Sequence, residues 1–380
     1  MKYILTTWAL FLIVSLPVSS QLIVDHTCTD ITLVPQSFIT LAKMQLHIAY
    51  GHTSHGSQII TGMTGLVSFA NNGGRGLSLP ENIFLWNDGG TDGAIDLHDN
   101  AMDGDVGYWP DWYNNTVAYL DDPAHADVNV IMWSWCGQVD DRYSNGVLWE
   151  QYLEPMGSLE TDYPDVTFVY MTGHLEYGHR ENVNAANDSI RSFCRNNHKV
   201  LFDFADIESY GPDGTCYKNN GDDACNYYDE SGDSIGNWAV EYQNTHTEGT
   251  DWYSCSSAHS EPLNANKKAY AAWYMFASLA GWNNTPSAII GEENTELEAR
   301  LYPNPAINQT IFEISFACEN NIQVDLVSAN GTLIMHNLIP QISGNKLIYT
   351  INTEKLKPAV YYLKVISSFN SEAYRLTIIH

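Results

Sequence analysis

Several residues that could carry out acyl transfer stand next to apolar or amphipathic runs of the sequence. Ser54 follows one such run, Gly137 and Gln138 follow another, and His259 precedes an amphipathic run. A serine at the start of a helix can attack a carbonyl carbon while a histidine takes its proton. Backbone and amide N–H groups can stabilise the resulting oxyanion. We therefore predict Ser54 as nucleophile and His259 as base. Gly137 and Gln138 are the predicted oxyanion donors.

Either Ser54 and His259 act alone as a dyad, or a carboxylate from elsewhere orients the histidine, and the sequence offers two for that role. Asp206 follows the apolar run 199–204, which itself contains the alternative, Asp203. Ser57 is a rival nucleophile, because the sequence does not determine which serine the turn exposes. Ser54 has the alternative role of a helix cap, and His259 has that of holding the loop that enters the last helix.

Other polar and aromatic side chains fall at the same places and are expected to line a substrate site. The two histidines among them are predicted to line the site or to hold it by hydrogen bonds, and the tryptophan has an alternative place in the core. These residues are His52, Ser57, Trp135, His174 and Glu176.

Strand and helix signals alternate through the part of the chain that holds these residues. Near-continuous apolar strands between helices indicate a doubly wound, mostly parallel five-stranded sheet of the flavodoxin-like type. Ligands of such α/β sheets bind outside the carboxyl ends of the strands, where the residues above are expected. The predicted strands are 46–50, 82–86, 128–133, 166–171 and 199–204, and the predicted helices begin at 58 and cover 147–160, 183–197 and 265–280.

The order of these motifs resembles the SGNH (GDSL-like) hydrolase superfamily over residues 44–282. That family has its serine after the first strand, oxyanion donors after later strands, and its histidine just before the last helix. The resemblance implies an SGNH-like fold and a serine esterase. Three departures stand out, namely Gly51-His52-Thr53-Ser54 for Gly-Asp-Ser, Gln138 for the expected Asn, and Ser256 for the Asp three residues before the histidine.

The predicted function is therefore a secreted SGNH-like hydrolase that removes acyl groups from an extracellular polysaccharide or ester by a Ser-His mechanism. One alternative is a polysaccharide lyase or glycosidase that uses His, Tyr and carboxylates. The other is a non-catalytic glycan-binding surface protein on a hydrolase-like fold.

No cofactor is required by this chemistry, but a Gly- and Asp-rich loop could hold structural calcium. Calcium favours oxygen ligands, although the spacing here does not match an EF-hand. The alternative is a solvated acidic loop. The candidate ligands are Asp213, Asp222, Asp223, Asp229 and Asp233.

The N-terminal residues have the layout of a secretory signal peptide. Lys2 is followed by an apolar run and by small residues before Gln21, and the run is shorter than the roughly 20 residues that span a bilayer. We predict a signal peptide at 1–20, the α/β domain at 21–285, a linker at 286–298 and a β-sandwich domain at 299–380. No membrane span is expected.

The last segment resembles the type A sorting domain of the type IX secretion system in Bacteroidetes. The resemblance rests on Tyr302-Pro303-Asn304-Pro305, on Asp325-Leu326-Val327 through Asn330-Gly331, and on Ala359 to Leu363. It implies passage through the periplasm, contact with the type IX machinery, and secretion or attachment to the cell surface. The alternative is a carbohydrate-binding β-module.

Charge and cysteine content agree with export. The net charge is -28, and residues 301–380 hold five acidic and five basic side chains, so the whole excess lies before residue 301. Coulomb repulsion makes nucleic acid an unfavourable partner.

Seven cysteines predict disulfides. Cys216–Cys225 is the predicted pair, and Cys318 is predicted to be a buried thiol.

Overall fold

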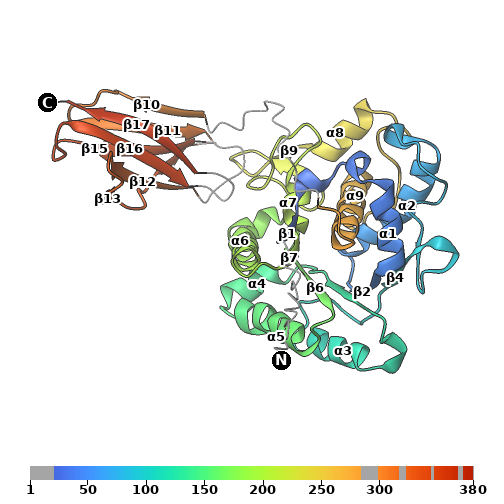
Figure 1. Cartoon of the computed structure of the whole chain (residues 1–380). Coiled ribbons are helices and arrows are strands. Elements are labelled where there is room, and N and C mark those ends of the chain that lie inside the picture. The colour runs from blue at the N-terminus through green and yellow to red at the C-terminus, as the bar shows by residue number, and fades with distance from the viewer. Residues whose placement is uncertain (1–20, 284–297, 316–321, 344–345, 367–370, 380) are drawn as a thin grey trace, which may run out of the picture. The chain divides into compact units, whose positions relative to one another are not determined.

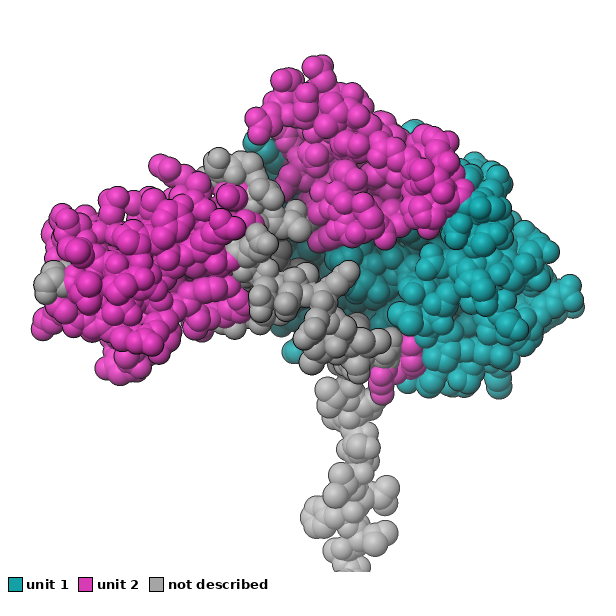
Figure 2. Space-filling model, turned by 90° about the horizontal axis from the view of Figure 1, so that it is seen from above, with its two compact units in different colours: residues 1–174, 181–207, 247–281 teal, residues 175–180, 208–246, 282–380 magenta. Residues whose placement is uncertain are grey.

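Seven parallel strands form the central sheet of the protein, seen in the computed structural model of Figure 1. The structure describes residues 21–283, 298–315, 322–343, 346–366 and 371–379. The chain divides into two compact units (Figure 2). The first comprises residues 1–174, 181–207 and 247–281, and the second comprises 175–180, 208–246 and 282–380.

The strand order of the sheet in the first unit is β1-β7-β6-β5-β2-β4-β3. The central strands are almost wholly buried and read as continuous apolar runs, as expected when helices cover both faces of a parallel sheet. The strands are β1 (Leu22–Val24), β2 (His47–Gly51), β3 (Trp86–Asn87), β4 (Ile95–Asp99), β5 (Val130–Trp133), β6 (Thr167–Met171) and β7 (Val200–Phe202).

Helices cover both faces of this sheet (Figure 1). On one face α9 packs against α2 and α1, and α9 carries an almost continuously buried surface. The other face is covered by α3, α5 and α6. The helices are α1 (Gln36–Gln45), α2 (Ser57–Asn71), α3 (Asp111–Leu120), α4 (Val139–Ser144), a π-helix at Trp149–Leu153, α5 (Glu154–Asp162), α6 (Arg180–Asn196), α7 (Phe204–Ser209) and α9 (Pro262–Leu279).

The prediction of an α/β domain with a parallel sheet is confirmed, but the predicted number of strands is wrong. The sheet has seven strands, because β1 and β4 were not predicted. β4 reads Ile-Asp-Leu-His-Asp, so apolar and charged residues alternate and no apolar run marks it. The predicted strand 82–86 is also wrong, since the strand there is only Trp86–Asn87.

Residues 208–246 belong to the second unit and are mostly turns and loops. They contain a two-stranded antiparallel sheet, β8 (Asn226–Tyr228) with β9 (Ser234–Asn237), followed by α8 (Trp238–Thr245). The Asn237 side chain caps α8 by accepting hydrogen bonds from the N–H groups of Ala239 and Val240.

The C-terminal segment folds into two four-stranded antiparallel sheets that share one apolar core. Phe312 and Tyr349 come from one sheet, and Leu326 and Leu363 come from the other. A small β-sandwich was predicted here, and the antiparallel β-sheets of that prediction are confirmed. The strands are β10 (Glu298–Tyr302), β11 (Gln309–Ser315), β12 (Gln323–Ser328), β13 (Leu333–Met335), β14 (Gln341–Ser343), β15 (Lys346–Asn352), β16 (Ala359–Ile366) and β17 (Ser371–Ile378).

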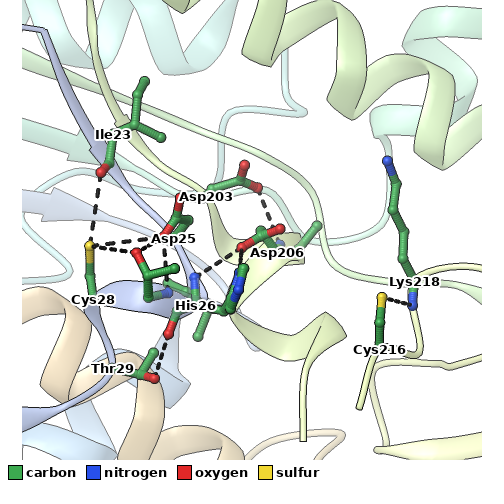
Figure 3. Close-up of polar contacts among 12 residues, drawn as sticks. Ile23, Asp25, His26, Cys28, Thr29, Asp203, Asp206, Cys216 and Lys218 are labelled. Carbon is green, nitrogen blue, oxygen red and sulfur yellow. Dashed lines mark hydrogen bonds and ion pairs between the residues drawn. The ribbon is translucent and has the colours of Figure 1, made fainter. Parts of the chain in front are cut away.

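The predicted disulfide between Cys216 and Cys225 is not formed. Cys225 is buried and carries a reduced thiol, as do Cys28, Cys136, Cys194 and Cys255. The sulfur of Cys216 accepts a hydrogen bond from the backbone N–H of Lys218 at 3.5 Å (Figure 3). The two cysteines bracket a loop in sequence, but closeness in sequence does not bring their sulfur atoms together.

Three of the sequence predictions concern residues that the structure does not describe. The signal peptide at 1–20, most of the linker at 286–298, and Cys318 lie outside the described residues. Within the described ranges, none of the helices has the length and apolar character needed to cross a membrane.

Candidate functional site

Ser54 lies in the tight turn that joins β2 to α2. Its Oγ is 3.3 Å from the sulfur of Cys136, which follows β5, the neighbouring strand in the sheet. Gly56 lets this turn lie close to the segment after β5, because a Cβ atom on Gly56 would lie 2.2 Å from Ser134 Oγ. The parallel register of β2 and β5 therefore places a hydroxyl and a thiol side by side at the carboxyl edge of the sheet.

Cys136 is also in contact with a histidine from the same turn. Nδ1 of His55 lies 3.2 Å from Cys136 Sγ. This hydrogen bond lowers the pKa of the Cys136 thiol to about 6, with smaller contributions in the same direction from Ser54 and Thr53, while partial burial acts against them. Above that pH the thiolate is the prevalent form, and the thiolate is the nucleophilic form of cysteine.

Two further histidines stack on the His55 ring. The His174 ring is nearly parallel to it, with 3.8 Å between centroids and 5° between planes. The His259 ring is 4.6 Å away at 18°. His55 and His174 are buried, and His259 is exposed. The turn after β2, the end of β6 and the loop before α9 thus contribute one imidazole each to a single cluster.

The loop that carries His259 is anchored to α2. The side-chain amide of Gln58, which is fully buried, donates to the carbonyl of Ala258 at 2.6 Å. His259 itself has a φ of 61°, in the left-handed region that non-glycine residues rarely occupy. Such a conformation persists only where the surroundings hold it, and Gln58 is one group that does so.

Among the residues that the structure describes, Ser54 Oγ hydrogen-bonds with Cys136 and not with His259. The predicted pair is therefore linked through the cluster and not directly. Ser57, the rival nucleophile, donates its hydroxyl to the Ser54 carbonyl at 2.6 Å and stands at the start of α2.

The predicted oxyanion donors lie beside Cys136 but interact with each other. The Gly137 N–H donates to the side-chain oxygen of Gln138 at 3.1 Å. Gly137 is exposed, and a Cβ built on it would lie 3.8 Å from Nε2 of His174. Gly137 thus lies next to the cluster, with its N–H directed to the Gln138 side chain.

The remaining predicted site residues are held by other contacts. His52 is buried between Asp99, 2.7 Å from its Nε2, and the Thr53 carbonyl, 2.8 Å from its Nδ1. Trp135 is buried and donates from its indole to the Met171 carbonyl at 3.0 Å. Glu176 lies 3.2 Å from the His179 ring.

Both carboxylates predicted as third catalytic groups have partners of their own. Asp206 accepts from the backbone and ring nitrogens of His26, and Figure 3 shows the two side chains facing each other. Burial opposes the ionisation of Asp206, but His26 outweighs it and lowers the pKa of Asp206 to about 2. Asp203 is buried and forms a bidentate pair with Arg191, at 2.6 and 2.7 Å.

The five acids predicted as calcium ligands mostly cap tight turns. Asp213 accepts from Thr215, Asp222 from Asn226, and Asp229 from the N–H groups of Ser231 and Asp233. Over the described ranges, no three of the five have oxygens within 4.8 Å of one another. The calcium site stays a prediction.

Sequence reasoning did not single out two members of the cluster, Cys136 and His55. Cys136 was counted among the disulfide cysteines of an exported chain, and His55 was one of several polar residues in the turn after β2. The available signal was position, since Cys136 follows a central strand directly, as a site residue of this fold class does.

The C-terminal sheets are explained by a comparison with known families. Residues 300–379 match the family described as "Secretion system C-terminal sorting domain". These residues are a type IX sorting domain. The sorting domain implies interaction with the type IX secretion machinery, and it indicates secretion followed by attachment to the cell surface or release.

The α/β body has no such match. No curated protein matches the chain. Among solved structures, an endo-β-1,4-mannanase from Thermotoga petrophila is similar at 9% identity and a TM-score of 0.18, over 67% of this chain and 48% of the mannanase chain. An engineered protein is similar at 12% identity and a TM-score of 0.23, over 95% and 99% of the two chains. Neither similarity is close enough to indicate a function.

Proposed function

We propose that the α/β body is a secreted acyl hydrolase whose nucleophile is Cys136. The observation that carries the proposal is the position of Cys136 Sγ, 3.3 Å from Ser54 Oγ and 3.2 Å from His55 Nδ1. A thiol beside a histidine, with a lowered pKa and partial exposure, is the arrangement of a reactive cysteine.

In the proposed reaction the Cys136 thiolate attacks the carbonyl carbon of an ester. The carbon–oxygen bond to the leaving alkoxide then breaks, and the alkoxide takes a proton from the His55 imidazolium. Water hydrolyses the thioester, giving one proton back to His55 and releasing the acid with the thiolate restored. The Gly137 N–H stabilises the negative oxygen formed in each attack.

The other members of the cluster assist this pair. The Ser54 hydroxyl donates to the thiolate and keeps it ionised. His174 and His259 hold the His55 ring between aromatic neighbours and so restrict its orientation toward sulfur. His259 is the exposed member and the one that a bound substrate would meet.

Export of the chain supports an extracellular substrate, and an acylated polysaccharide is the proposed one. The predicted serine mechanism is replaced here by a cysteine mechanism at the same edge of the sheet. Ser54 as nucleophile stays the competing prediction, as do a lyase or glycosidase and a glycan-binding protein without activity.

The test is hydrolysis of p-nitrophenyl acetate and of acetylated xylan by the wild-type protein and by Cys136→Ala. We expect release of nitrophenol and acetate by the wild type and loss of both in the variant. Cys255→Ala is the matched control, because burial raises the pKa of that thiol to about 12 and makes it inert. Equal activity of Cys136→Ala and wild type would overturn the proposal, and release of reducing or unsaturated ends would support the lyase or glycosidase.

A further inference from the structure

An open groove lies on the surface of the first unit, away from the residues of the cysteine–histidine cluster. It has a volume of about 540 Å³ and is lined by residues of α3, the π-helix, α5 and α6. Ligand pockets of proteins have volumes of roughly 300–1,000 Å³. None of its lining residues belongs to the cluster, so the groove needs an explanation of its own.

Trp149 forms one wall of the groove and is 54% exposed. The three tryptophans Trp112, Trp133 and Trp273 are by contrast fully buried. The Trp149 ring packs edge-on against Phe193, with 5.6 Å between centroids and an interplanar angle of 79°. Phe193 therefore braces the indole while leaving much of its surface open to a ligand.

The backbone under Trp149 is irregular. Residues Trp149–Leu153 form a π-helix that runs directly into α5. Single π-helical turns are rare and occur frequently at functional sites. Trp149 is the first residue of this wider turn.

Gly157 lines the groove, and its lack of a side chain leaves the groove unfilled at this position. It lies within α5, where glycine destabilises a helix relative to alanine. A Cβ atom built there would meet nothing within 4 Å. Packing therefore gives no reason for glycine at this position, whereas any longer side chain would project into the groove.

The polar lining consists of acceptors and hydroxyls. Glu154 and Asp162 are exposed and form no ion pair with any described residue. Ser158 and Thr161 add hydroxyl groups, which donate to backbone carbonyls of α5 at 3.2 and 3.0 Å. No lysine or arginine lines the groove.

We propose that this groove binds a neutral saccharide chain, with one sugar ring stacked on Trp149. Sugar rings present apolar C–H faces to aromatic side chains and hydroxyl groups to carboxylates and hydroxyls, and the groove offers both kinds of wall. The absence of cations in the lining and the net charge of -28 disfavour acidic glycans. The inference does not depend on the chemistry proposed for Cys136.

The test uses the full chain and isothermal titration with cellohexaose, mannohexaose and N-acetylchitohexaose, with hexagalacturonate as the acidic probe. We expect wild type to bind at least one neutral hexasaccharide and not hexagalacturonate. Trp149→Ala should weaken that binding at least tenfold. Gly157→Gln should abolish it while leaving the thermal unfolding temperature unchanged or raised, because the new side chain fills the groove and removes a helical glycine.

Met44→Ala is the matched control, since Met44 on α1 is 73% exposed and far from the groove in sequence. It should bind as wild type does. All variants should hydrolyse p-nitrophenyl acetate at the wild-type rate, which separates this inference from the proposed catalysis. Binding of none of the three neutral probes, preferential binding of hexagalacturonate, or wild-type binding by both groove variants would overturn the proposal.

Discussion

The Nδ1 atom of His55 lies 3.2 Å from Sγ of Cys136, and this contact joins two elements of the sheet that are far apart in sequence. His55 belongs to the turn after β2, and Cys136 follows β5. The contact exists because β2 and β5 are parallel neighbours whose carboxyl ends coincide. It makes an ordinary thiol acidic, and the proposed chemistry depends on it.

The reactivity of Cys136 should follow a pKa well below that of a free thiol. The pKa is lowered to about 6, so the thiolate forms as pH rises through 6 and not near 9. The rate of alkylation by iodoacetamide, measured by peptide mass spectrometry from pH 4 to 10, should therefore level off above about pH 7. Cys255 in the same digest is the internal control, and its alkylation should still be increasing at pH 10.

Replacing His55 should move that profile. In His55→Gln the largest cause of the lowered pKa is lost, so the midpoint of Cys136 alkylation should move upward toward the ordinary thiol value. Hydrolysis at pH 7 should fall by roughly 10²–10⁴-fold, the usual contribution of a general acid–base residue. An unchanged alkylation profile would show that His55 does not control the thiol.

Ser54→Ala separates the two candidate nucleophiles. If Ser54 only donates a hydrogen bond to the thiolate, its loss should cost roughly tenfold in rate, as for one hydrogen bond to a charged group. The alkylation midpoint of Cys136 should rise slightly at the same time. Complete loss of hydrolysis with an unchanged alkylation profile would favour Ser54 as nucleophile.

Asp206 should contribute to stability and not to hydrolysis. Its pKa is lowered to about 2 in the folded protein, so its stabilising effect is complete above the unfolded value near 3.9 and is lost as pH falls from there toward 2. Asp206→Asn should unfold more easily at pH 7 and lack this acid-dependent loss. Urea unfolding at pH 7 and pH 3, followed by tryptophan fluorescence, measures both effects. An Asp206→Asn variant with wild-type stability and no hydrolysis would instead indicate that Asp206 is a catalytic residue.

Mutation of the buried pair Arg191 and Asp203 should strongly lower the free energy of unfolding. Arg191→Ala leaves the Asp203 carboxylate buried without its bidentate partner, which typically costs about 3–5 kcal/mol. The double variant Arg191→Met with Asp203→Leu removes both charges and should lose less in urea unfolding. A larger loss in the double variant would contradict this account.

The fold was predictable where buried strands are uninterrupted apolar runs. The segments around β2, β5, β6 and β7 meet that condition. In the sorting domain, β11 and β15 show a different signal, because buried residues alternate with less buried ones along each strand. β4 does not, since each of its apolar residues is followed by a charged or polar one. Its place beside β2 is fixed by pairing across the sheet, which no local pattern reveals.

The site was predictable in position and less so in membership. The rule that ligands bind at the carboxyl ends of parallel strands pointed to the segments of Ser54 and His174, and His259 was predicted from its place just before the last helix. The structure places all three around His55 or Cys136. The partners of Asp203 and Asp206 could not be inferred, because Arg191 and His26 reach them from distant parts of the chain. The role of Cys136 depends on an imidazole 81 residues away.

The most direct test of the central claim is to trap the acyl-enzyme. The protein is mixed with p-nitrophenyl acetate, quenched in acid during turnover, digested at low pH and analysed by mass spectrometry. We expect an acetyl group on the peptide that contains Cys136, and hydroxylamine should remove it. An acetyl group on Ser54 or Ser57, or steady turnover with no acetyl group on Cys136, would contradict it.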